Sequence, residues 1–217
     1  MSKIKNQLSN INSIVDLIGE TPMIRLSGFE GLSTDKQIFI KAEWFNPGGS
    51  IKDRAALSMI QSGIEDKQLT SKKTIMDSSS GNTAIAYAMI GSALGFKVEL
   101  VTPENINIER KKTLEAYGAK IIYSSPFEGS DGAIIEARKL AKNFSDKYFM
   151  PDQYNNPANP LAHYSTTGPE IWDQLDGKIT HFIAGIGTSG TVMGSSKYLK
   201  EKNEKIKVIA VQPDNSL

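Results

Sequence analysis

Apolar residues follow two alternating patterns along this chain. Short runs rich in Ile, Val, Phe and Leu, such as 37–43 and 97–101, are typical of buried strands. Longer segments between them carry apolar residues at every third or fourth position, which is typical of helices packed on a core. Strands are expected at 23–26, 37–43, 73–77, 97–101, 119–123, 148–150, 180–184 and 206–211, and helices at 51–67, 84–94, 108–117, 133–143, 166–175 and 192–201.

The alternation of strands with helices predicts an α/β fold with mostly parallel, twisted sheets and helices on both faces. No internal repeat, low-complexity tract or long linker interrupts the pattern. In such folds ligands bind at the carboxyl ends of the strands, where the loops lead into the helices. Three of these loops hold candidate functional residues.

The first loop, residues 46–54 and here called the lysine turn, delivers a lysine to the start of a helix. The Pro-Gly-Gly run at 47–49 cannot lie in a helix interior, and Ser50 is a suitable N-cap for the helix expected at 51–67. Lys52 would then project from the first turn, where the positive end of the helix lowers the proton affinity of its amine. This suits a reactive amine, although a solvated lysine is the plain alternative.

The second loop, residues 78–83 and here called the serine loop, reads Ser-Ser-Ser-Gly-Asn-Thr and precedes the alanine-rich helix expected at 84–94. Hydroxyls, an amide and free backbone N–H groups therefore meet at a helix N-terminus, a place that binds anions. Simple capping of the helix is the alternative. Four hydroxyls and an asparagine nevertheless exceed what one cap requires.

The third loop, residues 185–191 and here called the glycine loop, lies between the strand expected at 180–184 and the helix expected at 192–201. Its glycines allow close approach of the backbone, and its N–H groups and hydroxyls are suitable donors to a phosphate. It lacks the Gly-Lys-Ser/Thr ending of a Walker loop, so nucleoside triphosphate hydrolysis is disfavoured.

An NAD-binding oxidoreductase is a rival interpretation of the glycine loop. Gly185, Gly187 and Gly190 satisfy G-x-G-x-x-G, and Asp214 follows the next strand near the place of a ribose partner. Against it, the loop comes late in the chain and carries hydroxyls suited to a phosphate monoester. The rival also leaves the lysine turn and the serine loop unexplained.

Composition excludes several classes of function. The net charge of +1, with no large basic cluster, disfavours nucleic acid as a partner. The absence of cysteine removes disulfides, thiolate catalysis and cysteine-based zinc sites. His163 has no acidic residues spaced around it for metal binding, so we expect no metal and interpret it as structural. His181 adjoins the strand expected at 180–184 and is interpreted as packed. The polar N-terminal stretch and the lack of a long apolar run predict a cytoplasmic protein without a membrane span.

Five segments occur in the order and spacing of the cysteine synthase (O-acetylserine sulfhydrylase) family, which the chain resembles over essentially its whole length. Their joint occurrence is far more specific than any one of them. The segments are 46–54, 79–83, 153–160, 167–172 and 185–191. The resemblance implies a pyridoxal-phosphate enzyme of the two-lobed, tryptophan-synthase-β-like fold (fold type II). Residues 1–45 would contribute to the larger lobe, 46–152 would form the smaller lobe, and 153–217 would belong to an incomplete larger lobe.

The resemblance also implies roles for individual residues. Lys52 would form the Schiff base with pyridoxal 5'-phosphate, and Asn82 would bond the 3-hydroxyl oxygen of the cofactor. The cofactor phosphate would be held by Gly187, Thr188, Ser189, Gly190 and Thr191. The substrate α-carboxylate would be received by Ser79, Ser80, Gly81, Thr83 and Gln153. Family members usually have threonine at position 79 and glycine at position 84, so Ser79 keeps the hydroxyl while Ala84 adds a methyl group near the loop.

The implied activity is cysteine synthesis. Acetate or phosphate would be eliminated from O-acetylserine or O-phosphoserine to leave an aminoacrylate, and sulfide would add to give L-cysteine. Lys52 would take the Cα proton and return it. The leaving group and the sulfur donor stay open. A homodimer and docking of a serine acetyltransferase tail are further expectations from the resemblance.

Other interpretations remain beside cysteine synthesis. Cystathionine β-synthase and serine/threonine dehydratases share the same use of a lysine and of a phosphate-binding loop. Segments 153–160 and 167–172 nevertheless favour the synthases. A non-catalytic remnant is a third class. Family members continue well past the strand expected at 206–211, into a part that supplies a serine to the pyridine nitrogen. We therefore expect a truncated chain that binds cofactor poorly or aggregates by itself.

Overall fold

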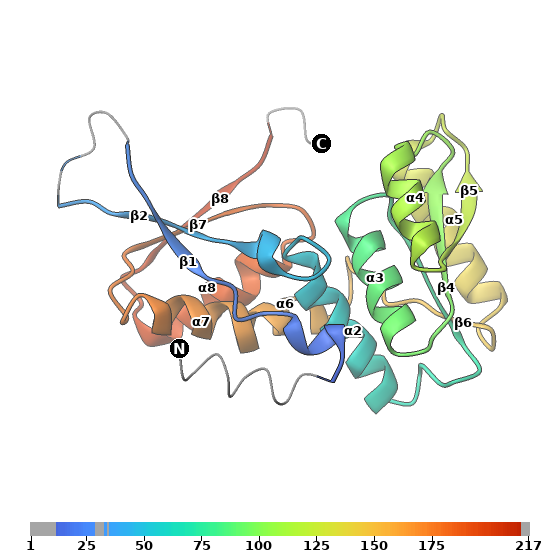
Figure 1. The fold of residues 1–217 in the computed structure, drawn as a ribbon, viewed down its shortest axis with the longest axis horizontal. Coiled ribbons are helices and arrows are strands. Elements are labelled where there is room, and N and C mark those ends of the chain that lie inside the picture. Colours follow the sequence, from blue (N-terminus) through green and yellow to red (C-terminus); the bar gives the residue numbers. More distant parts are fainter. Residues whose placement is uncertain (1–11, 29–32, 34, 214–217) are drawn as a thin grey trace.

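The computed structural model describes residues 12–28, 33 and 35–213 (Figure 1). Nearly all of the polar N-terminal stretch, and Asp214 with it, therefore lie outside the described residues. Within the described part, the strands form three separate sheets, one antiparallel and two parallel. The predicted α/β fold with mostly parallel strands is confirmed.

The N-terminal part forms the antiparallel sheet. After a short 3-10 helix, η1 (Ile14–Leu17), strand β1 (Met23–Leu26) pairs with β2 (Ile38–Lys41). A second 3-10 helix, η2 (Glu43–Phe45), leads from β2 into the lysine turn. This sheet therefore delivers the chain directly to the predicted reactive lysine.

A four-stranded parallel sheet follows, with strand order β5-β4-β3-β6. Ile75 pairs with Val98 between its two central strands, which sets the register there. The strands are β3 (Thr74–Ser78), β4 (Val98–Pro103), β5 (Lys120–Ser124) and β6 (Tyr148–Phe149). The carboxyl end of the central strand β3 runs into the serine loop, so this loop lies where the topology predicts a ligand.

Helices cover both faces of this parallel sheet. Ile75 points into a core shared with helices α2 (Lys52–Glu65), α3 (Asn82–Ala93) and α4 (Ile108–Ala116). The next residue, Met76, points into a core on the opposite face with α5 (Gly129–Asn143). Alternate residues of a strand point to opposite faces, so helices on both sides of the sheet bury β3 along its whole length, its polar residues included.

The remaining two strands form a second parallel sheet. Strand β7 (His181–Gly185) pairs with β8 (Lys207–Val211), and α8 (Gly190–Lys202) connects them. Phe182 packs into a core with Ile171 and Leu199 from the neighbouring helices. Ile183 points to the other face, where 61% of its surface is exposed.

One nearly continuous helical run lies between α2 and α8. It consists of α6 (Ala158–Ala162), a π-helical turn η3 (His163–Thr167) and α7 (Gly168–Gln174). Helix α6 packs on α2 and on α8, and Figure 1 shows α2 and α6 at the junction between the parallel sheets. The lysine turn and the glycine loop thus begin helices that share one neighbour.

Several expected boundaries are wrong by a few residues. Helix α2 begins at Lys52, and the Ser50 hydroxyl accepts the Lys52 N–H (3.2 Å) from outside the helix instead of acting as its N-cap. Helices α3 and α8 each begin two residues earlier than expected, because glycine and polar residues at a helix start escape a search for apolar periodicity. The segment 158–160, expected to be an irregular crossing, is helical.

Two further expectations have different outcomes. His181 is exposed and bonds only to the neighbouring Thr180 hydroxyl (3.0 Å) within the described residues, so the expectation that it is packed is wrong. The division of the chain into lobes at residues 46 and 153 stays a prediction.

Candidate functional site

The lysine turn is held by a backbone-to-carboxylate bond that only glycine permits. The Gly48 N–H donates to Asp53 Oδ2 (2.6 Å), and a Cβ at position 48 would lie 2.4 Å from Asp53 Oδ1. Gly49 has φ +80°, a conformation that L side chains rarely adopt. Burial raises the pKa of Asp53 to about 6, against the opposing effect of the Gly48 N–H. The two glycines therefore fix the turn immediately before Lys52.

Lys52 is a half-buried amine with no neutralising partner. Within the described residues, its side chain makes no ion pair or hydrogen bond, whereas the amine of Lys41 pairs with Glu170 (2.6 Å). Burial lowers the pKa of Lys52, because a charged amine loses solvation. Its place in the first turn of α2 acts in the same direction. Lys52 can therefore supply a neutral amine more readily than an exposed lysine can.

A buried charge cluster fixes α2 two residues after Lys52. The Arg54 guanidinium makes paired bonds to the carboxylates of Glu43 (2.8 and 2.9 Å) and Glu170 (2.6 and 2.7 Å). Its remaining contacts are to the hydroxyls of Thr21 (3.1 Å) and Thr166 (3.0 Å). These bonds keep the pKa of both carboxyls below the ordinary range despite their burial. Arg54 thus connects the N-terminal segment, α2 and the helical run that contains α7.

The serine loop forms the wall of a small cavity. Ser79, Ser80 and Gly81 line it, and Asn82 begins α3 on the exposed side. The volume is about 120 Å³, and the further lining residues are Ser78, Pro103, Ser130, Ala133, Ile134, Gln153 and Tyr154. Ser130 and Tyr154 were missed by the sequence analysis. Serine and tyrosine are common, so nothing in the sequence marks these two.

Thr83 and Gln153, which share a predicted role, are joined by a hydrogen bond. The Thr83 hydroxyl donates to Gln153 Oε1 (2.8 Å), and both side chains are buried. The Gln153 amide also lies 3.5 Å from the Ser78 carbonyl oxygen, a weak bond. The segment after β6 therefore closes onto the serine loop, although 70 residues separate Thr83 from Gln153.

The glycine loop presents backbone donors with no partner. Within the described residues, the N–H groups of 187–191 have no hydrogen-bond acceptor. Gly187 is surrounded by open space, because a Cβ there would meet nothing within 4 Å. Ser189 adopts φ +64°, a left-handed conformation that is unfavourable for serine and is typical of functional turns. The loop is therefore a cradle for an anion.

Asn159 joins this cradle to Gln153, the residue that closes onto the serine loop. Its amide nitrogen donates to the Thr188 hydroxyl (2.9 Å) and to the carbonyl oxygen of Gln153 (2.8 Å). Gly190 is required beside it, because a Cβ at position 190 would lie 2.0 Å from Asn159 Oδ1. In the sequence, Asn159 belongs to the segment 153–160, but nothing there indicates a role for it. Its contacts identify it as the link between two of the three predicted loops.

The buried His163 ring lies near both the glycine loop and Lys52. The ring is 2% exposed and lies between the hydroxyls of Thr167 (2.9 Å, Nδ1) and Thr191 (3.3 Å, Nε2). Burial lowers its pKa to about 4, and the positive charges of Arg54 and Lys52 act in the same direction. Lys52 thus lies within electrostatic reach of a ring that contacts the glycine loop. The structural interpretation of His163 agrees with its buried, hydrogen-bonded position.

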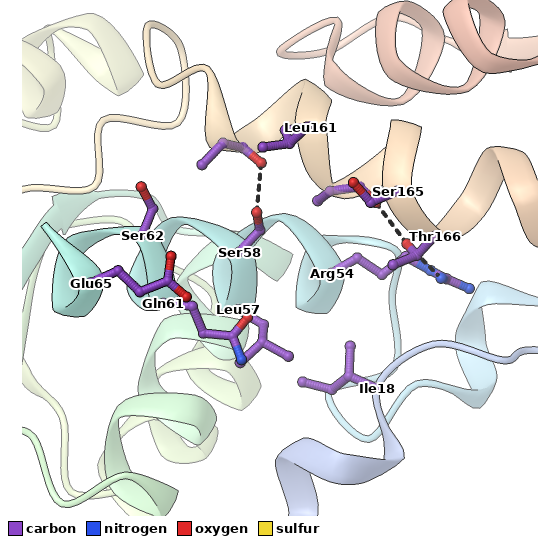
Figure 2. Close-up of a pocket in the computed structure, with 12 residues that line it drawn as sticks. Ile18, Arg54, Leu57, Ser58, Gln61, Ser62, Glu65, Leu161, Ser165 and Thr166 are labelled. Carbon is purple, nitrogen blue, oxygen red and sulfur yellow. Dashed lines mark hydrogen bonds between the residues drawn. The ribbon is translucent and has the colours of Figure 1, made fainter.

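A second cavity, of about 340 Å³, lies between α2 and the helical run at 158–167 (Figure 2). Figure 2 shows the Ser58 hydroxyl bonded to a backbone oxygen of α6 (2.8 Å, Ala158), and Arg54 bonded to Thr166. None of the predicted site residues lines this cavity. The chemistry implied by the three loops therefore does not take place there.

Neither a metal cluster nor a membrane-spanning helix occurs over the described ranges. No group of three His, Cys, Asp or Glu residues in this part of the chain could hold a metal ion. None of the helices there combines the length and apolar character that a membrane span requires. The candidate site therefore consists of the three loops and the side chains that connect them.

Comparison with known proteins gives one family and several relatives. The family model described as "Pyridoxal-phosphate dependent enzyme" matches residues 14–217. A cysteine synthase from Aquifex aeolicus is 50% identical over 203 residues, which are 93% of this chain and 62% of the relative. The crystal structure of cysteine synthase from Entamoeba histolytica superposes with a TM-score of 0.91 at 37% identity, over 95% of this chain and 62% of that chain.

Another solved relative has a different printed activity. The O-acetylserine dependent cystathionine β-synthase from Helicobacter pylori superposes with a TM-score of 0.89 at 37% identity, over 95% of this chain and 67% of that chain. Similarity of fold and sequence therefore extends to relatives that are named for different reactions. This chain spans about 62% of the length of the Aquifex relative.

Proposed function

We propose, from the premise that this chain belongs to the family of pyridoxal-phosphate dependent enzymes, that it carries the site of a cysteine synthase. The reaction would replace the group on Cβ of an O-activated serine, O-acetylserine or O-phosphoserine, with sulfide to give L-cysteine. Relatives named cysteine synthase support this proposal. With a pyridoxal-phosphate family, the dinucleotide interpretation of the glycine loop loses its basis.

The donor set fits pyridoxal phosphate. The unpaired N–H groups of 187–191 and the hydroxyls of Thr188, Ser189 and Thr191 would hold a phosphate monoester, and Gly187 leaves room for it. Asn82 would donate to the 3-hydroxyl oxygen. When bound, the cofactor supplies an aldehyde that condenses with an amine and a ring that takes up the electron pair left at Cα.

The residues of the chain itself would bind the substrate and move its proton. Ser79, Ser80 and Gly81 would receive the α-carboxylate at the N-terminus of α3, supported by Thr83 and Gln153. This binding would orient Cα–H toward Lys52, whose neutral amine would take the proton and later return it. A lowered pKa favours that role, because only the neutral amine can accept a proton.

The half-buried, unpaired amine of Lys52 is the observation that carries this proposal. The test is the visible absorbance of the purified chain with pyridoxal phosphate, for wild type, Lys52→Ala and the control Lys73→Ala, followed by O-acetylserine. Lys73 is a suitable control because it is also half-buried but lies outside the three loops. An absorbance band that is lost only in Lys52→Ala and shifted by O-acetylserine is expected. A band retained in Lys52→Ala would refute the role of Lys52.

Synthesis of cystathionine is the second candidate, because the Helicobacter relative named for that reaction is as similar as the Entamoeba cysteine synthase. The two reactions would share every residue assigned above and differ in the sulfur nucleophile. Competition between sulfide and homocysteine at equal concentration distinguishes them. Preference for homocysteine would replace cysteine synthesis as the proposed reaction.

The proposed location is the cytoplasm, and the proposed partners are a second copy of the chain and a serine acetyltransferase. Light scattering of the purified chain tests self-association, and titration with the C-terminal peptide of a serine acetyltransferase tests docking. If the chain is a monomer and does not bind the peptide, O-activated serine and sulfide remain as its proposed partners.

A further inference from the structure

A buried tyrosine–carboxylate pair joins the two ends of the serine loop. Asp77 precedes the loop in β3, and Tyr87 follows it in α3; their exposed fractions are 2% and 0%. The Tyr87 hydroxyl donates to Asp77 Oδ2 (3.0 Å), and the Ser78 N–H donates to Asp77 Oδ1 (2.8 Å). One carboxylate therefore holds the residue that enters the loop and the helix that leaves it.

The pair is continuous with residues already assigned to the substrate. The backbone N–H of Gln153 also stabilises the charged form of Asp77. The Gln153 side chain accepts from the Thr83 hydroxyl (2.8 Å), as described above. Asp77 thus touches both neighbours of the cavity, the start of the loop and the closing segment. A change in its position or charge would reach Gln153 and the residue that leads into the serine loop.

The electrostatic surroundings make Asp77 sensitive to protonation. Burial raises its pKa to about 7, the charge of Asp152 acts in the same direction, and the Ser78 N–H and Tyr87 hydroxyl oppose the change. The pKa of Tyr87 is raised as well, by burial and by Asp77. Helix α2 contributes only the Met59 sulfur, 3.9 Å from the Tyr87 hydroxyl, which does not titrate. A buried carboxylate with no cation is unfavourable for stability, so stability alone does not explain this pair.

We propose that Asp77 and Tyr87 are positioning residues that hold the serine loop in the shape that receives the substrate carboxylate, and that this carboxylate binds more tightly when Asp77 carries a proton. The inference rests on the proposed function, because it assumes a carboxylate at the serine loop. An ionised Asp77 and a bound carboxylate would be two negative charges on either side of one short loop. Their repulsion in a partly buried site corresponds to about tenfold in affinity.

The first experiment tests the shape of the loop without cofactor or substrate. Hydrogen exchange is measured in the serine loop for wild type, Tyr87→Phe and the control Tyr148→Phe. Tyr148 is a matched control because its hydroxyl also donates to a buried-side carboxylate, Glu99 (2.6 Å), on the same sheet but away from the loop. Loss of a bond to a charged acceptor should make loop exchange about tenfold faster in Tyr87→Phe only. Unchanged exchange, or equal acceleration in both variants, would overturn the positioning role.

The second experiment tests the charge. L-Alanine, which has a carboxylate but no leaving group on Cβ, is titrated into the pyridoxal-phosphate-loaded protein at pH about 6 and about 8. Asp77→Asn keeps the shape of the side chain but cannot ionise. The Kd of wild type should rise about tenfold more than that of Asp77→Asn across this range. Parallel pH profiles of the two proteins would overturn the charge effect.

The two experiments separate this inference from the proposed function. If wild type fails to bind L-alanine at either pH, the proposed carboxylate site is wrong, and the charge effect falls with it. The exchange measurement decides the positioning role independently. Asp77→Asn also serves in that measurement if Tyr87→Phe does not fold.

Discussion

Replacement of Arg54 by methionine should destabilise the fold more than any surface change. The Arg54 guanidinium binds two carboxylates, Glu43 and Glu170, and its side chain is only 2% exposed. Lys41 would still pair with Glu170 after the change. Glu43 would keep only the Thr21 hydroxyl (2.6 Å) and the Asn46 amide (2.8 Å). The Glu43 carboxylate would thus remain in a buried place with no cation bonded to it among the described residues.

The expected loss is about 3–5 kcal/mol in the free energy of unfolding, because removing one partner of a buried ion pair leaves an uncompensated charge. Arg138→Met is the matched control: the Arg138 guanidinium lies 3.6 Å from Asp152 with 48% of its side chain exposed. Exposed pairs contribute about 1 kcal/mol or less. The double variant Arg54→Met/Glu43→Gln should be less destabilised than the sum of its single changes, because the neutral amide at position 43 leaves no unpaired charge behind.

Urea unfolding at pH 7 provides the assay. The two tryptophans report on this region, since Trp44 follows Glu43 and Trp172 lies two residues after Glu170. Wild type should also lose stability as the pH falls below about 4.5, the ordinary pKa of glutamate, because the pKa values of Glu43 and Glu170 are lowered by folding. This acid sensitivity should be weaker in Arg54→Met. A loss below about 1 kcal/mol, or additive single changes, would refute the reasoning.

Three further predictions follow from single contacts. Gly190→Ala should lower the melting temperature and weaken phosphate binding, because its Cβ would lie 2.0 Å from Asn159 Oδ1. The Cβ of Gly187→Ala would meet nothing within 4 Å, so this variant should keep the wild-type melting temperature in calorimetry. Ile183→Lys should reduce self-association in light scattering, because this side chain is 61% exposed on an uncovered sheet face, and an unchanged apparent mass would contradict this. His163, with its pKa lowered to about 4, should cost stability as the pH falls from about 6.5 to 4, since the unfolded chain binds the proton first; His163→Gln should lack this dependence in urea unfolding.

The α/β fold follows from local properties of the sequence. Strand β3, for example, lies between two segments of helical periodicity, and its apolar pair Ile75 and Met76 is buried on opposite faces, so its existence and its parallel neighbours could be predicted. The first residues of the helices were harder to predict from the sequence. Helix α8 begins at Gly190, directly after Ser189 in a left-handed conformation, and the apolar periodicity of the helix begins only after these residues. A pattern of apolar residues cannot predict such a backbone turn.

Only the three loops of the candidate site could be predicted from the sequence. The lysine turn, the serine loop and the glycine loop are marked by unusual runs of glycine and hydroxyl residues. The residues that support these loops are not. Arg54 reaches Glu170 across 116 residues, and Asp77 reaches Tyr87 through a hydrogen bond between a strand and a helix. A single charged or aromatic residue at such a position is common in any sequence, so only the packed structure identifies its partner.

The segment after β6 explains why the serine loop and the glycine loop depend on one another although they begin different helices. Gln153 closes on Thr83 of the serine loop, Asn159 binds Thr188 of the glycine loop, and a bond between these two connectors joins them (2.8 Å, from the Asn159 amide to the Gln153 carbonyl oxygen). Each connector uses an amide, which can donate and accept without carrying charge. The segment can therefore couple two anion-binding loops without adding a charge that would compete with either anion. This requirement accounts for an asparagine- and glutamine-rich sequence where the topology alone would need only a connection.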